Sequence, residues 1–266
     1  MSGAERALLV TLLVTALRRP VGAVLLRLLT GAAADPALYY AGVVLEECLL
    51  WAAAMLFMRP GRGGGRRPEA RWGAGCVAAV LAGAAAQAVT AFLAPYWTAF
   101  IGAESAAMLM PRNGAEWLLA ALALVAAPAV AEETFYRGGL MNRLTECMGA
   151  PAAFFVTAAV FALSHGSLAG LPAHLTISLL CSLAYLRYGR LTVSVLTHMG
   201  YNAAALLISV ADIPAVVPLL SAIVLAGVAT AWAVDAPWRA SHGRMTRRAA
   251  LLTALLLLAA GLQISA

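Results

Sequence analysis

The sequence predicts an all-α protein, a polytopic bundle of about eight or nine transmembrane helices. Of its 266 residues, 63% are hydrophobic and only 11% are charged, and the mean hydropathy is +0.86. These values exclude a water-soluble globular domain. Apolar runs near the ~20 residues needed to cross a bilayer recur from one end of the chain to the other. Because no long polar stretch separates them, residues 1–266 are expected to form a single membrane domain.

The expected spans follow one another at short intervals. The first is interrupted by Arg18, Arg19 and Pro20, which favours a membrane helix broken near the proline over a cleaved signal peptide. Gly149 and Pro151 are expected to end a long helix that begins at residue 115. The spans comprise residues 7–34, 37–58, 72–93, 115–147, 151–165, 168–186, 191–211, 213–234 and 249–266.

Basic residues indicate the orientation in the membrane. Arginines gather in alternate connections, around residues 59–71, 143, 187–190 and 239–248, and the positive-inside rule places these in the cytoplasm together with the N-terminus. All 18 basic residues are arginines, and alanine is abundant. We interpret this bias as a property of the genome and not as a sign of nucleic-acid binding. It suggests a bacterium, and the expected location is therefore the bacterial inner membrane. The lipid bilayer is therefore the expected environment, and no nucleic acid is an expected partner.

A few polar residues interrupt the apolar spans. A charge at the centre of a membrane helix costs about 2.5–3.5 kcal/mol, so each needs a physical reason. Glu133 and Arg137 are four residues apart and share a helix face, whereas Glu132 lies about 100° away, beside Phe135 and Tyr136. Two glutamates in different environments are typical of one structural and one catalytic carboxylate. We expect Glu133 to be ion-paired and Glu132 to act as a general base.

Two further spans carry matching polar groups. His198 and Asn202 are four residues apart, so both point into the same space and are suited to stabilise an oxyanion. His165 follows Phe161 by one turn. At ~1.5 Å per residue, Glu132, His165 and Asn202 lie about 16–21 Å from the inner loops. Three spans thus predict one site near the bilayer centre.

These residues form three spaced motifs on three spans. The motifs, in chain order, are Glu132-Glu133-x-x-x-Arg137, Phe161-x-x-x-His165 and His198-x-x-x-Asn202. Together they resemble the motifs of the CAAX protease and bacteriocin-processing (CPBP) family of intramembrane proteases, which includes the type II CAAX prenyl proteases. The resemblance covers a core of about residues 118–211.

The resemblance implies a glutamic-type endopeptidase with its site in a water-filled cavity of an all-helical fold. Its implied roles are water activation by Glu132 and His165, oxyanion stabilisation by His198 and Asn202, and support by Glu133 and Arg137. Members of the family have been described both as metalloproteases and as metal-independent enzymes. Because the chain lacks a His-Glu-x-x-His pattern, we expect no required cofactor, with a divalent metal such as zinc as the alternative.

Other polar residues are expected to pack helices. Glu46 and Glu47 repeat the paired glutamates, but Trp51 stands where the arginine would be. We assign them to helix packing, with a place in the cavity wall as the alternative. His174, near a helix start, is also assigned to a packing hydrogen bond.

The expected partner is a membrane-associated protein or peptide substrate. Removal of a C-terminal tail or a propeptide is favoured over cleavage of prenylated proteins, because the composition suggests a bacterium. Two other functions stay open. One is a proton-coupled transporter that uses the same residues as a relay, and the other is a non-catalytic membrane scaffold. Clustering at one depth favours a reaction centre over a relay.

Overall fold

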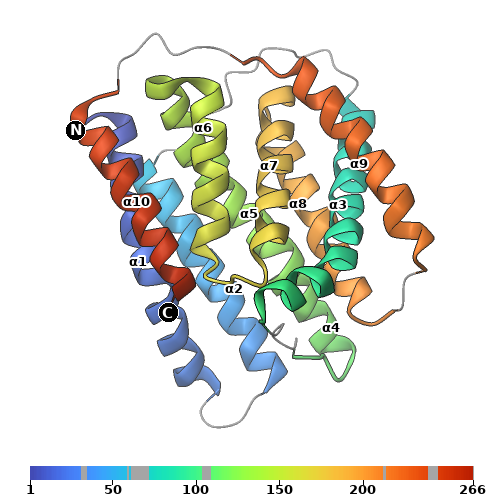
Figure 1. Ribbon diagram of the computed structural model, residues 1–266. Coiled ribbons are helices and arrows are strands. Elements are labelled where there is room, and N and C mark those ends of the chain that lie inside the picture. The colour runs from blue at the N-terminus through green and yellow to red at the C-terminus, as the bar shows by residue number, and fades with distance from the viewer. Residues whose placement is uncertain are drawn as a thin grey trace.

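The computed structural model describes residues 1–30, 35–58, 60, 72–103, 109–211, 214–238 and 245–265, and none of these residues forms a strand. The helices pack side by side as a bundle (Figure 1). The arginines of residues 59–71 and 239–244, on which the predicted orientation partly depends, lie outside the described residues.

The described helices follow the predicted spans closely. They are α1 (Gly3–Thr30), α2 (Pro36–Ala53), α3 (Trp72–Ile101), α4 (Gly114–Ala121), α5 (Ala127–Glu133), α6 (Asn142–Ser164), α7 (Leu171–Tyr188), α8 (Leu191–Ile208), α9 (Val216–Asp235) and α10 (Arg247–Ser265). Within the described part of the chain, seven helical stretches are long and apolar enough to cross a membrane. The predicted polytopic helical bundle is therefore confirmed.

The chain differs from the prediction at two prolines. Pro20 lies inside α1, which runs unbroken from Gly3 to Thr30. Likewise, α3 continues through Pro95 to Ile101, eight residues beyond the predicted end at Leu93. Prolines are tolerated in membrane helices because neighbouring groups can satisfy the freed backbone carbonyls. A proline was thus a weaker stop signal here than it is in a soluble protein.

The long helix predicted from residue 115 is present, and glycine ends it. The stretch Gly114–Ser164 is assigned as 51 continuous helical residues, but Gly149 has a φ of 80° and non-helical geometry. This left-handed conformation is open to glycine at little cost. The chain reverses there, so that the second part of α6 runs back through the bundle (Figure 1).

Two π-helical stretches flank the predicted glutamates. Leu122–Ala126 precedes α5 and Thr134–Met141 follows it. α5 is only seven residues long, and Glu132 and Glu133 are its last two residues. π-helical turns are rare and are frequently found at functional sites. The irregular backbone thus coincides with the motif that carries the predicted general base.

A close helix crossing fixes the position of α8. Gly83 of α3 lies so near α8 that a Cβ there would overlap the carbonyl of Thr197, and a Cβ on Gly200 would overlap the carbonyl of Val80. Small residues allow membrane helices to approach at backbone distance. This contact holds the segment of α8 that carries His198.

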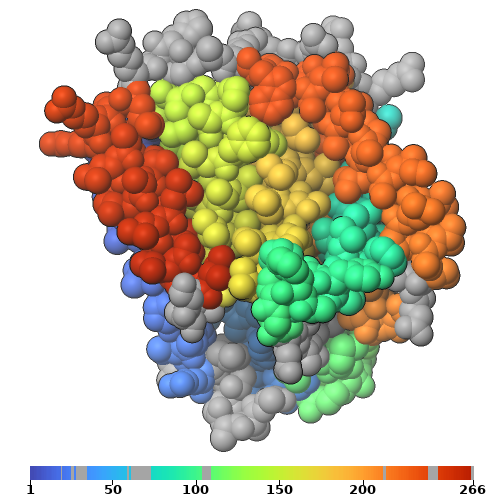
Figure 2. Space-filling model, viewed as in Figure 1, coloured from blue at the N-terminus to red at the C-terminus, as the bar shows by residue number. Residues whose placement is uncertain are grey.

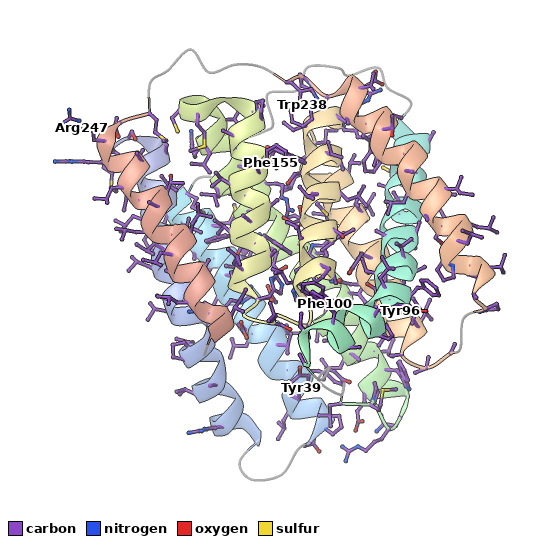
Figure 3. The ribbon with its side chains drawn as sticks, viewed as in Figure 1. Tyr39, Tyr96, Phe100, Phe155, Trp238 and Arg247 are labelled. Atoms are coloured by element: carbon purple, nitrogen blue, oxygen red, sulfur yellow. The ribbon has the colours of Figure 1, made fainter. Side chains whose placement is uncertain are left out.

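The outer surface is apolar. Figure 2 shows α9 and α10 on either side of the outward faces of α6 and α7. Phe155 on α6 and Phe100 on α3 are 65% and 83% exposed, as expected for side chains that contact lipid tails. Figure 3 places Trp238 and Arg247 near one end of the bundle, and Tyr39 towards the other. Aromatic side chains near both ends are typical of the two membrane interfaces.

Candidate active site

Glu133 lies at the centre of a buried hydrogen-bond network. Its Oε1 is 2.8 Å from Arg137 Nη1 and 2.9 Å from His198 Nδ1. Its Oε2 accepts a hydrogen bond from the Ser194 hydroxyl. The side chains of Glu133 and Arg137 are both fully buried. The predicted ion pair is therefore present, and it reaches His198 on a second helix.

Arg137 extends this network to α6 and α7. Its Nη2 donates to the carbonyl and the hydroxyl of Ser178, at 2.6 and 2.7 Å. Its guanidinium lies 4.9 Å from the centre of the Phe161 ring, a distance at which a cation is attracted to the ring face. One buried pair thus joins α5 and its π-helical extension to α6, α7 and α8.

Glu132 faces two imidazole rings. Its Oε1 is 3.8 Å from Nε2 of His165, and its Oε2 is 3.9 Å from Nε2 of His198. Both distances exceed that of a direct hydrogen bond, so the carboxylate and the two Nε2 atoms can all contact a water molecule beside them. The structure thus brings together three residues that the sequence predicted to share one site.

The tautomers of both rings follow from their partners. His165 Nδ1 lies 2.8 Å from the carbonyl of Phe161, which can only accept, so Nδ1 carries a proton. His198 Nδ1 faces the Glu133 carboxylate in the same way. In the neutral form of each ring, Nε2 then has a free lone pair directed at Glu132.

Asn202 lies one turn beyond His198 on α8 and is half-buried. Among the described residues, its side chain has no hydrogen-bond partner. The predicted common helix face is thus present, and the contacts that join the other site residues do not include Asn202.

His174 packs against the site, although its predicted role was helix packing alone. Its ring stacks on His165 with centroids 3.9 Å apart and an interplanar angle of 23°. The Phe161 ring also contacts His165, with centroids 4.7 Å apart. His165 therefore packs against two rings, one from α6 and one from α7.

Arg18 of α1 is the residue that the sequence analysis missed. Its guanidinium makes ion pairs with Glu46 at 2.7 Å, with Glu47 at 2.6 Å and with Glu132 at 2.9 Å. Glu46 and Glu47, predicted to pack helices with a place in the cavity wall as the alternative, both belong to the ion-pair cluster of Glu132. The available signal was a charged residue in the middle of the first apolar span, which requires acidic partners in the membrane.

A cavity of about 350 Å³ adjoins the cluster. Arg18 and Glu46 line one side, and Ser164 and His165 at the end of α6 line the other. Tyr39 of α2 also contributes to its wall. The cavity therefore reaches the polar residues around Glu132 from between α1, α2 and α6.

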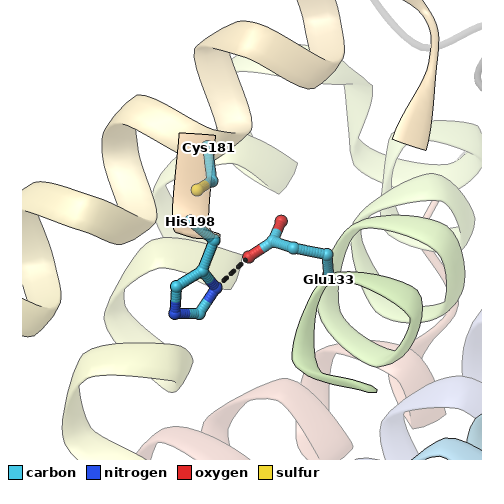
Figure 4. A group of neighbouring side chains, drawn as sticks. All are labelled: Glu133, Cys181 and His198. Atoms are coloured by element: carbon cyan, nitrogen blue, oxygen red, sulfur yellow. Dashed lines mark hydrogen bonds and ion pairs between the residues drawn. The ribbon is translucent and has the colours of Figure 1, made fainter. Parts of the chain in front are cut away.

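Two sets of side chains in this region carry donor atoms of the kind that bind a metal ion. Donor atoms of Glu133, Cys181 and His198 lie within 4.8 Å of one another (Figure 4). Both oxygens of Glu133 are already engaged, however, and the Arg137 guanidinium 2.8 Å away would repel a cation. This first set does not fit a metal.

Glu132 with the Nε2 atoms of His165 and His198 is the second set. Two imidazoles and a carboxylate are ligands that zinc accepts, and both Nδ1 atoms have the supporting partners typical of zinc-binding histidines. Arg18 occupies Oε1 of Glu132 at 2.9 Å. A cation would have to displace this guanidinium, so the second set fits only with a rearrangement.

Together, fold and site define a multi-pass helical membrane protein with a carboxylate and histidine centre among its helices. Residues 114–204, about a third of the chain, match the model of the family described as Type II CAAX prenyl endopeptidase Rce1-like. All three motifs lie in this segment, and the predicted resemblance to the CPBP family is confirmed there. The match is thus to a segment of a family whose description is that of an endopeptidase. No curated protein and no solved structure gives a significant match.

Proposed function

We propose that the protein is an intramembrane endopeptidase in which Glu132 and His165 activate a water molecule. The observation that carries this proposal is the position of the Glu132 carboxylate between two Nε2 atoms, at 3.8 and 3.9 Å. Each imidazole is anchored through its other nitrogen, and a cavity lies alongside. A base, an orienting histidine and room for a peptide are what amide hydrolysis requires.

In the proposed mechanism, the water between Glu132 and His165 attacks the carbonyl carbon of the scissile bond. Glu132 accepts a proton from this water and passes it to the leaving amine as the tetrahedral intermediate collapses. Glutamate can thus serve first as base and then as acid. The products are a carboxylic acid and an amine, which exchange a proton to give a carboxylate and an ammonium, and no net proton stays on the protein.

His198 and Asn202 are proposed to stabilise the oxyanion. For Nε2 of His198 to donate, its ring must carry both protons, with Nδ1 donating to the Glu133 carboxylate. The Asn202 amide supplies a second donor. Each such donor typically contributes a factor of ~10²–10³ to the rate. Glu133 and Arg137 have the supporting role, because they orient His198 and join the helices around it.

We further propose that the reaction requires no metal. The ion pair between Arg18 and Glu132 supports this reading, because the positively charged guanidinium occupies the carboxylate oxygen that a metal ion would need as a ligand. Zinc held by Glu132, His165 and His198 is the competing arrangement. Its chemistry would be the polarisation of the substrate carbonyl and of water.

The proposed substrates are membrane-associated proteins or peptides that lose a C-terminal tail or a propeptide. The family description adds prenylated proteins as a further class. The proposed location is a bacterial inner membrane, with the N-terminus in the cytoplasm. This orientation is supported by Arg143, near the start of α6, and by Arg187 and Arg190, at the turn between α7 and α8.

The test compares the termini of membrane and secreted proteins between cells with the unchanged protein and cells with Glu132→Ala. We expect unprocessed precursors to accumulate with Glu132→Ala. Glu146→Ala is the matched control, because Glu146 lies on α6 with 56% of its side chain exposed, and it should process normally. Identical termini in all strains would refute the proposal and favour a transporter or a scaffold.

A further inference from the structure

Arg18 lies on α1, far outside the segment that matches the family model. Its three ion pairs use three different nitrogen atoms: Nε for Glu46, Nη1 for Glu132 and Nη2 for Glu47. All three distances are between 2.6 and 2.9 Å, and the arginine side chain is 18% exposed. One guanidinium therefore joins α1 and α2 to the last turn of α5.

The planar fork of a guanidinium fixes the directions of its hydrogen bonds, which a lysine ammonium does not. Glu132 ends in a carboxylate whose last torsion is otherwise broad. Arg18 holds its Oε1 at 2.9 Å, and Oε2 is then left facing Nε2 of His198 at 3.9 Å. The bond from Arg18 thus selects the orientation in which the carboxylate meets both histidines.

Glu46 and Glu47 accept hydrogen bonds from the two guanidinium nitrogens of Arg18 that do not contact Glu132. Glu47 is 3% exposed, and Glu46 lines the cavity with Arg18 and His165. One turn after Arg18, Gly22 lies where a Cβ would be only 3.0 Å from Glu46 Oε2. The absence of a side chain at Gly22 makes room for the Glu46 carboxylate, so the α1–α2 contact is shaped around this ion pair.

We infer that Arg18 is a positioning residue for Glu132, and that Glu46 and Glu47 orient Arg18. The inference rests on the proposed function, in which Glu132 activates the water. A purely structural alternative exists, because Arg18 also neutralises carboxylates in an apolar layer. The experiment must therefore separate orientation of Glu132 from compensation of charge.

The experiment follows, by pulse-chase labelling, a precursor that accumulates with Glu132→Ala. Arg18→Gln should slow its cleavage by about 100-fold, the usual effect of a misplaced catalytic group. Arg18→Lys should be intermediate, since it keeps the charge and loses the fork. Arg27→Gln is the control, because Arg27 is an exposed arginine in the last turn of α1, and it should cleave at the unchanged rate.

Two further variants separate orientation from charge. Arg18→Gln combined with Glu46→Gln and Glu47→Gln removes the excess carboxylates, so the protein should fold but stay slow. Membranes from Arg18→Ala cells should retain uncleaved precursor. Guanidinium chloride is then added at millimolar concentration, far below the molar range that unfolds proteins. It should raise the rate of precursor cleavage about tenfold, because the free guanidinium ion can take the place of the missing side chain. The same salt should not restart cleavage in Glu132→Ala membranes.

The outcomes are distinguishable. Unchanged cleavage by Arg18→Gln, or full activity of the triple variant, would overturn the inference and leave the proposed function intact. Failure of guanidinium to restart cleavage in correctly folded Arg18→Ala protein would also overturn it. If no precursor accumulates with Glu132→Ala, the proposed function fails and the inference fails with it.

Discussion

The imidazole of His198 and the carboxylate of Glu133 are joined by a hydrogen bond of 2.9 Å between Nδ1 and Oε1. This bond links the first motif on α5 to the third on α8, and it leaves Nε2 of His198 directed at Glu132. Glu133 therefore positions His198, the imidazole that Glu132 faces. The following predictions test this arrangement and the fold around it.

Removing the charge of Glu133 should destabilise the protein. Glu133→Gln leaves Arg137 buried without its carboxylate, and breaking a buried pair in this way typically costs about 3–5 kcal/mol. The melting temperature in detergent, followed through the intrinsic tryptophan fluorescence, should fall clearly. Glu146→Gln at the exposed position on α6 is the control and should melt like the unchanged protein. An unchanged melting temperature for Glu133→Gln would show that the pair does not support the fold.

Asn202 should matter for cleavage and not for stability. Because its side chain has no partner among the described residues, Asn202→Ala should leave the melting temperature unchanged. Loss of an oxyanion donor should reduce the rate of precursor cleavage by ~10²–10³. Ser209→Ala, at the exposed end of the same helix, should retain the full rate. Normal cleavage by Asn202→Ala would remove this residue from the proposed site.

The contact between α3 and α8 should not accept a methyl group. Gly200→Ala would place a Cβ on the carbonyl of Val80, and overpacking of this kind typically costs about 1–3 kcal/mol. We expect a lower melting temperature and slower cleavage, since α8 carries His198. The control is Gly227→Ala on α9, where a Cβ would meet nothing within 4 Å. Equal stability of the two variants would contradict the close crossing.

Acid should weaken the connection at the start of α2. A hydrogen bond from Arg112, with backbone N–H groups of Leu38 and Ala37, lowers the pKa of Asp35 from its ordinary value. A carboxyl group whose pKa is lowered on folding stabilises the protein at pH values above the pKa of the unfolded state, about 3.9. This stabilisation is lost as the pH falls through the pKa of the folded state.

Asp35→Asn keeps a side chain that can cap α2 and removes the titrating charge. The melting temperature of this variant should lie below that of the unchanged protein at neutral pH, and the difference should shrink below about pH 4. A difference that stays constant with pH would show that the charge of Asp35 contributes nothing.

Chelators should not stop cleavage. If Arg18 rather than a cation occupies Oε1 of Glu132, membranes washed with a strong zinc chelator should process their precursors at the unchanged rate. Loss of cleavage that added zinc restores would instead favour the metal-bound arrangement at Glu132, His165 and His198.

Much of the fold could be predicted because it depends on local properties of the chain. Hydropathy located the spans, and a glycine with a left-handed backbone ended the long helix near the predicted position. The helical period predicted the pairing of Glu133 with Arg137, and this pairing is present despite the π-helical turn that begins at Thr134. The unbroken passage of α1 through Pro20 was missed, because the behaviour of a membrane proline depends on its neighbours.

The sequence by itself determined that this is a helical membrane protein with three polar motifs at a common depth, because span length, helix period and motif spacing are fixed along the chain. Only the tertiary structure decided which charges meet. Arg18 is 114 residues from Glu132, and no periodicity connects them. In an apolar layer each buried charge requires a partner, and the packing of α1 against α2, and of α2 against α5, determines that Glu46, Glu47 and Glu132 share the same arginine.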